Sequence, residues 1–179
     1  MRRLVLLTVL ATSLALPAAA FAALANGGSG DDGALSVKNG RGKVILGVPL
    51  NGTGVPFNGA AVGRVGHGWI KITDPIADDG QGADVWGCDN APGGVDVTDT
   101  TIYCSGDNLR FRAAGGKYKI VVVGRGVFLS AVGHGTLTLN GAGDSPSIDA
   151  DGLFSINDSP FRSLPDDAKT FLLAAPAGG

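Results

Sequence analysis

The chain has 179 residues, with 14 Lys and Arg against 16 Asp and a formal net charge of −2 at neutral pH. Thirty glycines, a single Gln and no Glu leave few strong helix formers, so the composition predicts an all-β protein. The excess of acid argues against nucleic acid as a partner.

A cleaved secretory signal peptide is predicted at residues 1–25. A basic start, Met1 to Arg3, precedes an apolar run from Leu4 to Leu16, and small residues follow. The apolar run is short and interrupted, which argues against a retained membrane helix. We therefore expect a secreted, extracellular chain of about 155 residues, which is a normal size for one domain.

The domain organisation follows from the composition along the chain. Residues 26–33 predict a flexible leader, residues 34–174 a single β domain, and residues 175–179 a tail. Short strands are expected, in chain order, at 34–38, 43–50, 55–65, 69–73, 97–104, 109–114, 117–123, 127–132, 136–139, 152–157 and 170–173.

Between residues 74 and 94 the strand pattern fails. This acidic segment is rich in Gly, and eight Asp but no Lys or Arg occur between Ile72 and Leu109. We expect a long, irregular excursion from the sheet.

The strongest pattern lies between Leu109 and Leu139 and predicts a β meander. Gly115-Gly116 is typical of a two-residue hairpin loop, a second turn is expected at 124–126, and a three-residue loop at 133–135. The first loop would pair Arg112 with Lys119. Side-chain alternation then places one set of residues on the core face: Leu109, Phe111, Ala113, Tyr118, Ile120, Val122, Val127, Leu129, Ala131, Leu137 and Leu139.

A weak internal repeat relates residues 65–72 (VGHGWIKI) to residues 132–139 (VGHGTLTL). It is compatible with duplication of a β meander. About ten short strands separated by turn signals predict an antiparallel sandwich or a small barrel, and the pattern does not choose between them.

The segments R-F-R at 110–112, G-G-K-Y at 115–118 and S-A-V-G-H-G-x-L-x-L at 130–139 resemble the core of small exported bacterial all-β proteins of uncharacterised function. The resemblance covers about a quarter of the chain. It implies export and a β fold, and no activity, substrate or site comes with it.

Cys88 and Cys104 stand 16 positions apart. In an exported protein this pair predicts a disulfide, which would hold the irregular segment between them. A pair of free thiols or a metal site is the alternative.

Calcium is a possible cofactor. Residues 147–158 match a twelve-residue calcium loop in part, with Asp149, Asp151, Gly152 and Asp158 in register, although Ser147 replaces the first ligand and no helices flank it. The simpler interpretation is an Asp-Gly turn that opens a strand. The acidic segment is a second candidate for a hard cation. The hypothetical metal ligands are Asp74, Asp78, Asp79, Asp84, Asp89, Asp149, Asp151 and Asp158.

Catalytic patterns are weak. His67 and His134 occupy equivalent repeat positions and could share a metal, or could simply be polar turn residues. Ser130 and His134 lie about 13 Å apart along an extended strand, and no nucleophile elbow is present. We therefore assign no catalytic residue.

A basic face is predicted on the meander, where Arg110, Arg112, Lys117 and Lys119 alternate with core residues. Like charges on neighbouring strands repel, so an anion should cover them, either the acidic segment or an external acidic polymer. Trp69 should point away from a core formed by Ile70 and Ile72, to bind a ligand or to be covered by a loop containing Trp86.

These features favour a secreted, non-catalytic β domain that acts as a binding or structural module at the cell exterior. The expected partner is an anionic cell-wall polymer, a glycan or a surface protein. Two alternatives stay open: a calcium-stabilised or self-associating envelope protein, and a hydrolase with a site assembled from loops.

Overall fold

The computed structural model describes residues 31–47, 55–74, 82–88, 96–98, 100–143 and 151–176. The described part contains no helix, and all its strands belong to one hydrogen-bonded antiparallel sheet that is not closed into a barrel. The strands are β1 (Gly33–Leu46), β2 (Phe57–Thr73), β3 (Ala83–Trp86), β4 (Asp96–Thr98), β5 (Thr101–Gly141), β6 (Leu153–Ile156), β7 (Arg162–Ser163) and β8 (Lys169–Leu173).

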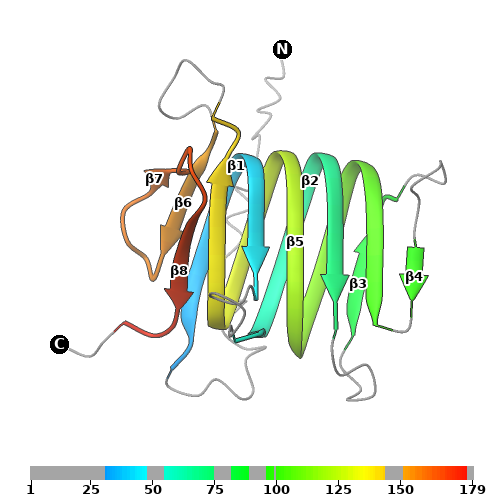
Figure 1. Cartoon of the computed structure of the whole chain (residues 1–179), viewed down its shortest axis with the longest axis horizontal. Coiled ribbons are helices and arrows are strands. Elements are labelled where there is room, and N and C mark those ends of the chain that lie inside the picture. Colours follow the sequence, from blue (N-terminus) through cyan, green and yellow to red (C-terminus); the bar gives the residue numbers. More distant parts are fainter. Residues whose placement is uncertain are drawn as a thin grey trace, which may run out of the picture.

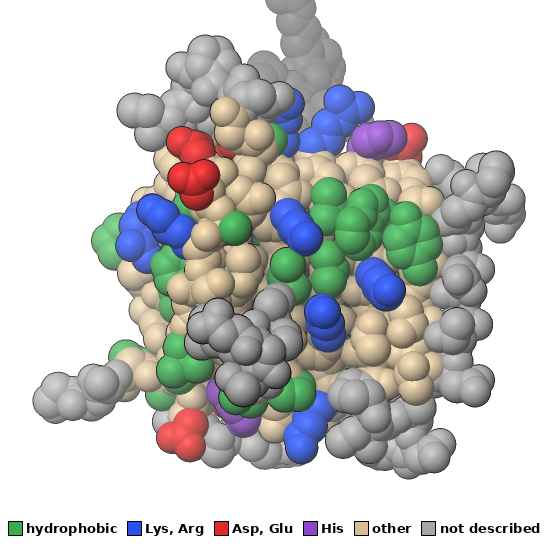
Figure 2. Space-filling view, viewed as in Figure 1, with side chains coloured by type: hydrophobic (Ala, Val, Ile, Leu, Met, Phe, Trp, Pro, Cys, Tyr) green, Lys and Arg blue, Asp and Glu red, His purple; other side chains and the backbone are tan. Residues whose placement is uncertain are grey.

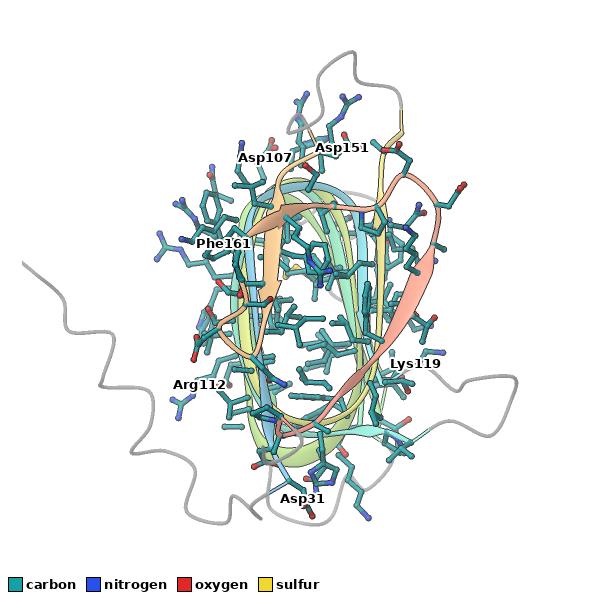
Figure 3. All side chains as sticks on the ribbon, turned by 90° about the vertical axis from the view of Figure 1, so that its left-hand side faces the viewer. Asp31, Asp107, Arg112, Lys119, Asp151 and Phe161 are labelled. Atoms are coloured by element: carbon teal, nitrogen blue, oxygen red, sulfur yellow. A yellow bond between two sulfur atoms is a disulfide. The ribbon has the colours of Figure 1, made fainter. Side chains whose placement is uncertain are left out.

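Three strands are long because they continue from one layer of the molecule into the other, β1 and β2 once and β5 repeatedly. β1, β2 and β5 run up one side, fold over a rim and continue down the opposite side, so that the sheet becomes a flattened coil (Figure 1). Viewed from its end, the coil forms an elongated loop of ribbon with side chains packed inside (Figure 3). The result is a two-layer sandwich built from a single folded sheet.

The hydrogen-bond register defines the two layers. Layer A contains residues 34–38, 60–65, 108–113 and 127–132 with β3, β6 and β7. Layer B contains residues 43–46, 69–73, 101–105, 119–123 and 135–141 with β4 and β8. Neighbouring segments are antiparallel: Phe57 pairs with Tyr118, whereas Arg64, later in β2, pairs with the earlier Arg110.

Glycines line both rims where the sheet folds. At the Asp107 rim, at the top of Figure 3, Gly42, Gly124, Gly68 and Gly106 are successive register partners. At the opposite Asp31 rim, Gly133 pairs with both Gly33 and Gly59. Neighbouring backbones approach closely at these positions.

The core lies between the layers and contains every residue that alternation predicted for it. Leu109, Tyr118, Ile120, Leu137 and Leu139 are fully buried. The other predicted core residues, which are at most 2% exposed, are Phe111, Ala113, Val122, Val127, Leu129 and Ala131.

The predicted hairpins, however, are wrong. Gly115 and Gly116 lie inside β5 at the Asp31 rim, and Arg112 pairs with Val62 rather than with Lys119. The turns expected at 124–126 and 133–135 are also rim positions within β5. β2 lies between two successive passes of β5 and pairs with both of them. These two passes therefore do not pair with each other, as they would in a hairpin.

Two strands were not predicted. β3 lies within the acidic segment, whose other residues are mostly outside the described part of the chain, and β7 precedes β8. The predicted signal peptide also lies outside the described residues. Part of the predicted leader is ordered, because the carbonyl oxygen of Asp31 accepts a hydrogen bond from the amide of Ala175 at 2.7 Å.

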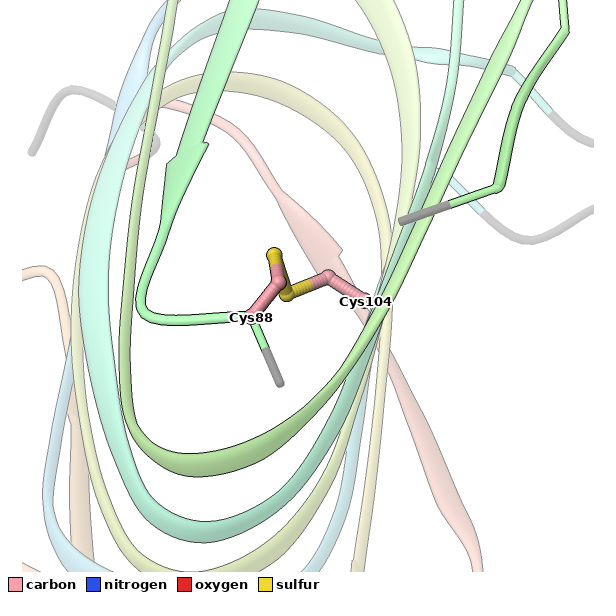
Figure 4. Close-up of a disulfide and its surroundings, with 2 residues drawn as sticks. All are labelled: Cys88 and Cys104. Atoms are coloured by element: carbon pink, nitrogen blue, oxygen red, sulfur yellow. A yellow bond between two sulfur atoms is a disulfide. The ribbon is translucent and has the colours of Figure 1, made fainter. Parts of the chain in front are cut away.

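The predicted disulfide between Cys88 and Cys104 is formed, with 5.4 Å between their Cα atoms. Cys88 follows β3 of layer A, and Cys104 is buried in the layer B part of β5. The bond crosses the interior (Figure 4) and therefore joins the two layers at the end of the sandwich.

Candidate functional site

An aromatic patch lies on the outward side of layer B. Ile70 and Ile72 are buried, so Trp69 and Lys71 point outward, as the sequence predicted. Tyr103 is the register partner of Lys71, and its ring lies 5.8 Å from that of Trp69 between centroids. The outward direction of these two side chains was predicted correctly because side-chain alternation along a strand does not depend on which strands pair with it.

Two rows of register partners extend the patch across the layer. One row joins Lys43, Val123 and Trp69. The next row joins Ile45, Val121, Lys71 and Tyr103. We define the aromatic patch as Ile45, Trp69, Tyr103, Val121 and Val123.

Three exposed lysines surround the patch: Lys43, Lys71 and Lys119. Figure 2 shows this face, where hydrophobic side chains gather over the strands and Lys and Arg side chains lie among them. The central segments 43–46, 69–73, 101–105, 119–123 and 135–141 contain no acidic residue. The centre of this face is thus both apolar and cationic, whereas the edge strand β4 places Asp96 opposite Tyr103.

The predicted basic face is divided between the layers. Arg110 and Arg112 lie on layer A, whereas Lys119 lies on layer B, and Figure 3 shows Arg112 and Lys119 on opposite sides of the coil. Lys117 is exposed at the Asp31 rim, opposite Asn58. The prediction of one face was wrong because it rested on the hairpin that does not form.

One strand of the acidic segment, β3, lies beside Arg110 and Arg112 on layer A, and both arginines are exposed. Asp84 in β3 lies directly opposite Arg112, and Trp86 lies opposite Arg110. Trp86 is 52% exposed there, on the layer away from Trp69, so it does not cover Trp69 as one alternative proposed. Other cations of layer A lie over aromatic rings, including Arg64 over Phe128 at 4.1 Å.

The predicted metal ligands are dispersed. Asp74 ends β2 in layer B, Asp84 lies on layer A, and Asp151 and Asp158 lie at opposite ends of β6. Asp151 and Gly152 form the turn that precedes β6, whereas residues 147–150 of the predicted calcium loop lie outside the described residues. The described residues contain no group of three or more metal-ligating side chains. Asp78, Asp79, Asp89 and Asp149 lie outside the described residues.

Asp151 is the one buried residue among the described metal candidates, at 5% exposure. Its Oδ2 accepts a hydrogen bond from the amide of Gly143 at 2.8 Å. Its Oδ1 is buried and has no hydrogen-bond partner among the described residues.

The two histidines lie at opposite rims, so they cannot share a metal. His67 Nδ1 lies 2.7 Å from Asp107 Oδ1, and His134 Nδ1 lies 2.9 Å from Asp32 Oδ1. The repeat therefore places one histidine, in contact with an aspartate, at each rim.

Tyr103 and Lys43 were not singled out by sequence reasoning, and Lys71 was predicted to point outward with Trp69 but was given no role. A signal existed in their alternation with the buried Cys104, Val44 and Ile70, which sends their side chains outward. Their proximity to Trp69 depends on strands from distant parts of the chain.

No protein-family model matches this chain, and no match was found among the curated proteins or the solved structures. The resemblance to small exported bacterial proteins therefore stays an expectation. In the described part of the chain no helix is long and apolar enough to cross a membrane.

Proposed function

We propose that this protein is a secreted, non-catalytic binding module for an acidic glycan, which lies along the aromatic patch on the outward side of layer B. The observation that carries the proposal is the pair of neighbouring rings, Trp69 and Tyr103, beside the exposed Lys43, Lys71 and Lys119. Asp96 on β4, at the edge of the layer, is the register partner of Tyr103. The aromatic rings and the lysines of this face each complement a chemical group of such a polymer.

The rings and their aliphatic neighbours supply apolar contact. A sugar ring has an apolar side of C–H groups that packs well against a flat aromatic surface. Trp69 and Tyr103 are partly exposed and adjacent, so together they offer a surface for successive sugar units.

The lysines supply attraction for carboxylate, sulfate or phosphate groups. Lys43, Lys71 and Lys119 are exposed around the patch, where their long side chains can adjust to a flexible ligand. A second copy of this chain is a poor occupant, because a face-to-face dimer would oppose lysines with lysines.

Export is part of the proposal and rests on the predicted signal peptide. The disulfide between Cys88 and Cys104 is compatible with an extracellular protein. Acidic glycans are abundant outside cells, so the proposed ligand and the proposed location agree.

The test is co-sedimentation or calorimetry of the chain from Asn26 onward with polygalacturonate, an acidic glycan, and with dextran, a neutral one, across a salt series. We expect polygalacturonate to bind more tightly than dextran at low salt. Trp69→Ala should weaken binding about tenfold, equivalent to about 1.4 kcal/mol. Lys71→Gln and Lys119→Gln should lose affinity mainly at low salt.

Trp86→Ala is the matched control, because Trp86 is an exposed tryptophan on the other layer. Equal losses in the two tryptophan variants would exclude the aromatic patch as the binding surface. Absence of binding to both polymers would overturn the proposal. Sedimentation velocity without glycan tests the alternative of self-association.

A further inference from the structure

A second cluster of cations lies at the Asp107 rim, beside the aromatic patch. Arg41 on β1 is the register partner of Arg125 on β5, and Arg125 is in turn the partner of His67 on β2. His67 also pairs with Asp107. These four charged or titratable residues thus form one row of register partners along the rim where the sheet bends.

This row borders a hollow of about 450 Å³. Such a volume lies within the range of about 300–1,000 Å³ that is typical of sites for small molecules. The lining residues of the hollow are Asn39, Arg41, Gly66, His67, Asp107, Arg125 and Gly126.

The charges of the hollow favour an anion. Arg41 and Arg125 are register partners on neighbouring strands about 5 Å apart, and both line the hollow. Within the described residues no carboxylate forms an ion pair with Arg125. The carboxylate that lines the hollow, Asp107, has its Oδ1 held by His67 Nδ1 at 2.7 Å.

We propose that this hollow binds a tetrahedral oxyanion, phosphate or sulfate, between the guanidinium groups of Arg41 and Arg125. Guanidinium groups present a planar fork of N–H donors that matches the oxygens of these anions. Phosphate and sulfate monoesters fit the same site, because the hollow is larger than the anion alone.

The position of the hollow connects it to the glycan-binding face. The row of Arg41 and Arg125 lies two residues along the strands from the row of Lys43, Val123 and Trp69, a distance of about 7 Å. A phosphate or sulfate ester on a bound glycan would reach the rim hollow. The role of the hollow as a subsite for a glycan ester rests on the proposed glycan binding. The binding of a free anion in the hollow does not.

The test is an NMR titration of the ¹⁵N-labelled chain from Asn26 onward, at constant ionic strength, with sodium phosphate, sodium sulfate, methyl phosphate and sodium chloride. We expect saturable shifts of the Gly66, His67 and Gly126 amides with the first three anions but not with chloride. Arg125→Gln should weaken phosphate binding about tenfold, because it removes one of the two charged clamps. Asp107→Asn should strengthen it about threefold, because it removes the competing negative charge.

Arg162→Gln is the matched control, since the Arg162 guanidinium lies over Phe154 on β6, away from the hollow. Equal shifts with chloride, or unchanged binding in Arg125→Gln, would overturn the proposal. Binding of phosphate and sulfate without methyl phosphate would assign the site to the free anion rather than to an ester. Trp69→Ala should bind phosphate normally, so failure of the glycan proposal and failure of this one are distinguishable.

Discussion

Individual glycines allow the sheet to fold over its rims. Gly68 has a φ of +152°, and a Cβ atom at this position would clash with the carbonyl oxygen of Val123 on the neighbouring strand. Gly124, its register partner, has a φ of +158° and faces a similar clash with the carbonyl oxygen of His67. Side chains are therefore excluded from both partners.

At the residue scale we predict that Gly68→Ala lowers the free energy of unfolding by at least about 2 kcal/mol, because backbone strain and the clash add. Urea unfolding followed by circular dichroism measures the change. Gly82→Ala is the control, since nothing lies within 4 Å of a Cβ atom built there. Equal stability of the two variants would show that the rim glycines are not required.

Single side chains also connect the ends of the domain. Asn157, at a φ of +51°, accepts a hydrogen bond from the amide of Ala34 at 2.8 Å through its Oδ1. Its Nδ2 donates to the carbonyl oxygen of Ala174 at 2.7 Å. One side chain thus links the start of β1 with the segment after β8.

At the scale of elements, β5 decides how the fold is built. Its passes alternate between layer A and layer B, and β1 and β2 pair with them in both layers. A meander of the same sequence would keep these passes in one layer. The two arrangements bury the same side chains but give them different neighbours.

Cross-linking distinguishes the two arrangements. Ser36 and Ser130 are direct register partners on layer A, so their Cα atoms should be about 4.5–5.5 Å apart. We expect Ser36→Cys with Ser130→Cys to form a disulfide under oxidising conditions, detected by peptide mapping, because that distance suits the bond.

Arg112→Cys with Lys119→Cys is the contrasting pair, which the meander would place opposite each other. We expect no bond between these two cysteines, because the layers of a sandwich are about 10 Å apart. A bond in the second pair and not in the first would support the meander instead.

At the scale of the whole molecule, the C-terminal segment completes layer B. β8 pairs with residues 135–139 of β5, Leu173 is fully buried, and Phe171 packs on Phe154 with 5.6 Å between ring centroids. The described contacts of this segment extend to Ala175, whose amide donates a hydrogen bond to the carbonyl oxygen of Asp31. The domain boundary should therefore lie close to Pro176.

Truncation tests this boundary. A chain ending at Pro176 should unfold like the full chain in urea, whereas a chain ending at Ala168 should lose at least about 3 kcal/mol, because it removes a strand and a buried leucine. Should the shorter chain fail to fold, Leu173→Ala gives the same information, with Leu172→Ala, at a position 66% exposed, as its control. Unchanged stability of Leu173→Ala would contradict the assignment of β8 to the core.

The charge distribution is also a property of the whole molecule. The chain is slightly acidic, yet the exposed sides of both layers carry Lys and Arg, such as Lys71 on layer B and Arg64 on layer A. Many Asp lie in the acidic segment and at the rims. Net charge alone was therefore a poor guide to the surface that a ligand would meet.

The sequence by itself determined which side chains face the interior, the disulfide, and the absence of helices from the part of the chain that the structure describes. Alternation with a period of two separates Ile120 from Lys119 whatever the chain does at its next glycine. Two cysteines in a chain with export features leave a single possible pairing. The outward position of Trp69 in the aromatic patch was predictable for the same reason, because Trp69 alternates with the buried Ile70.

Only the tertiary structure decided which outward side chains share a surface. A glycine pair permits either a hairpin within one sheet or a fold to the opposite layer, and both preserve the alternation. The choice depends on strands such as β2 that pair alongside from distant parts of the chain. For that reason Arg112 and Lys119 separated, whereas Tyr103 joined Trp69 and Arg41 joined Arg125.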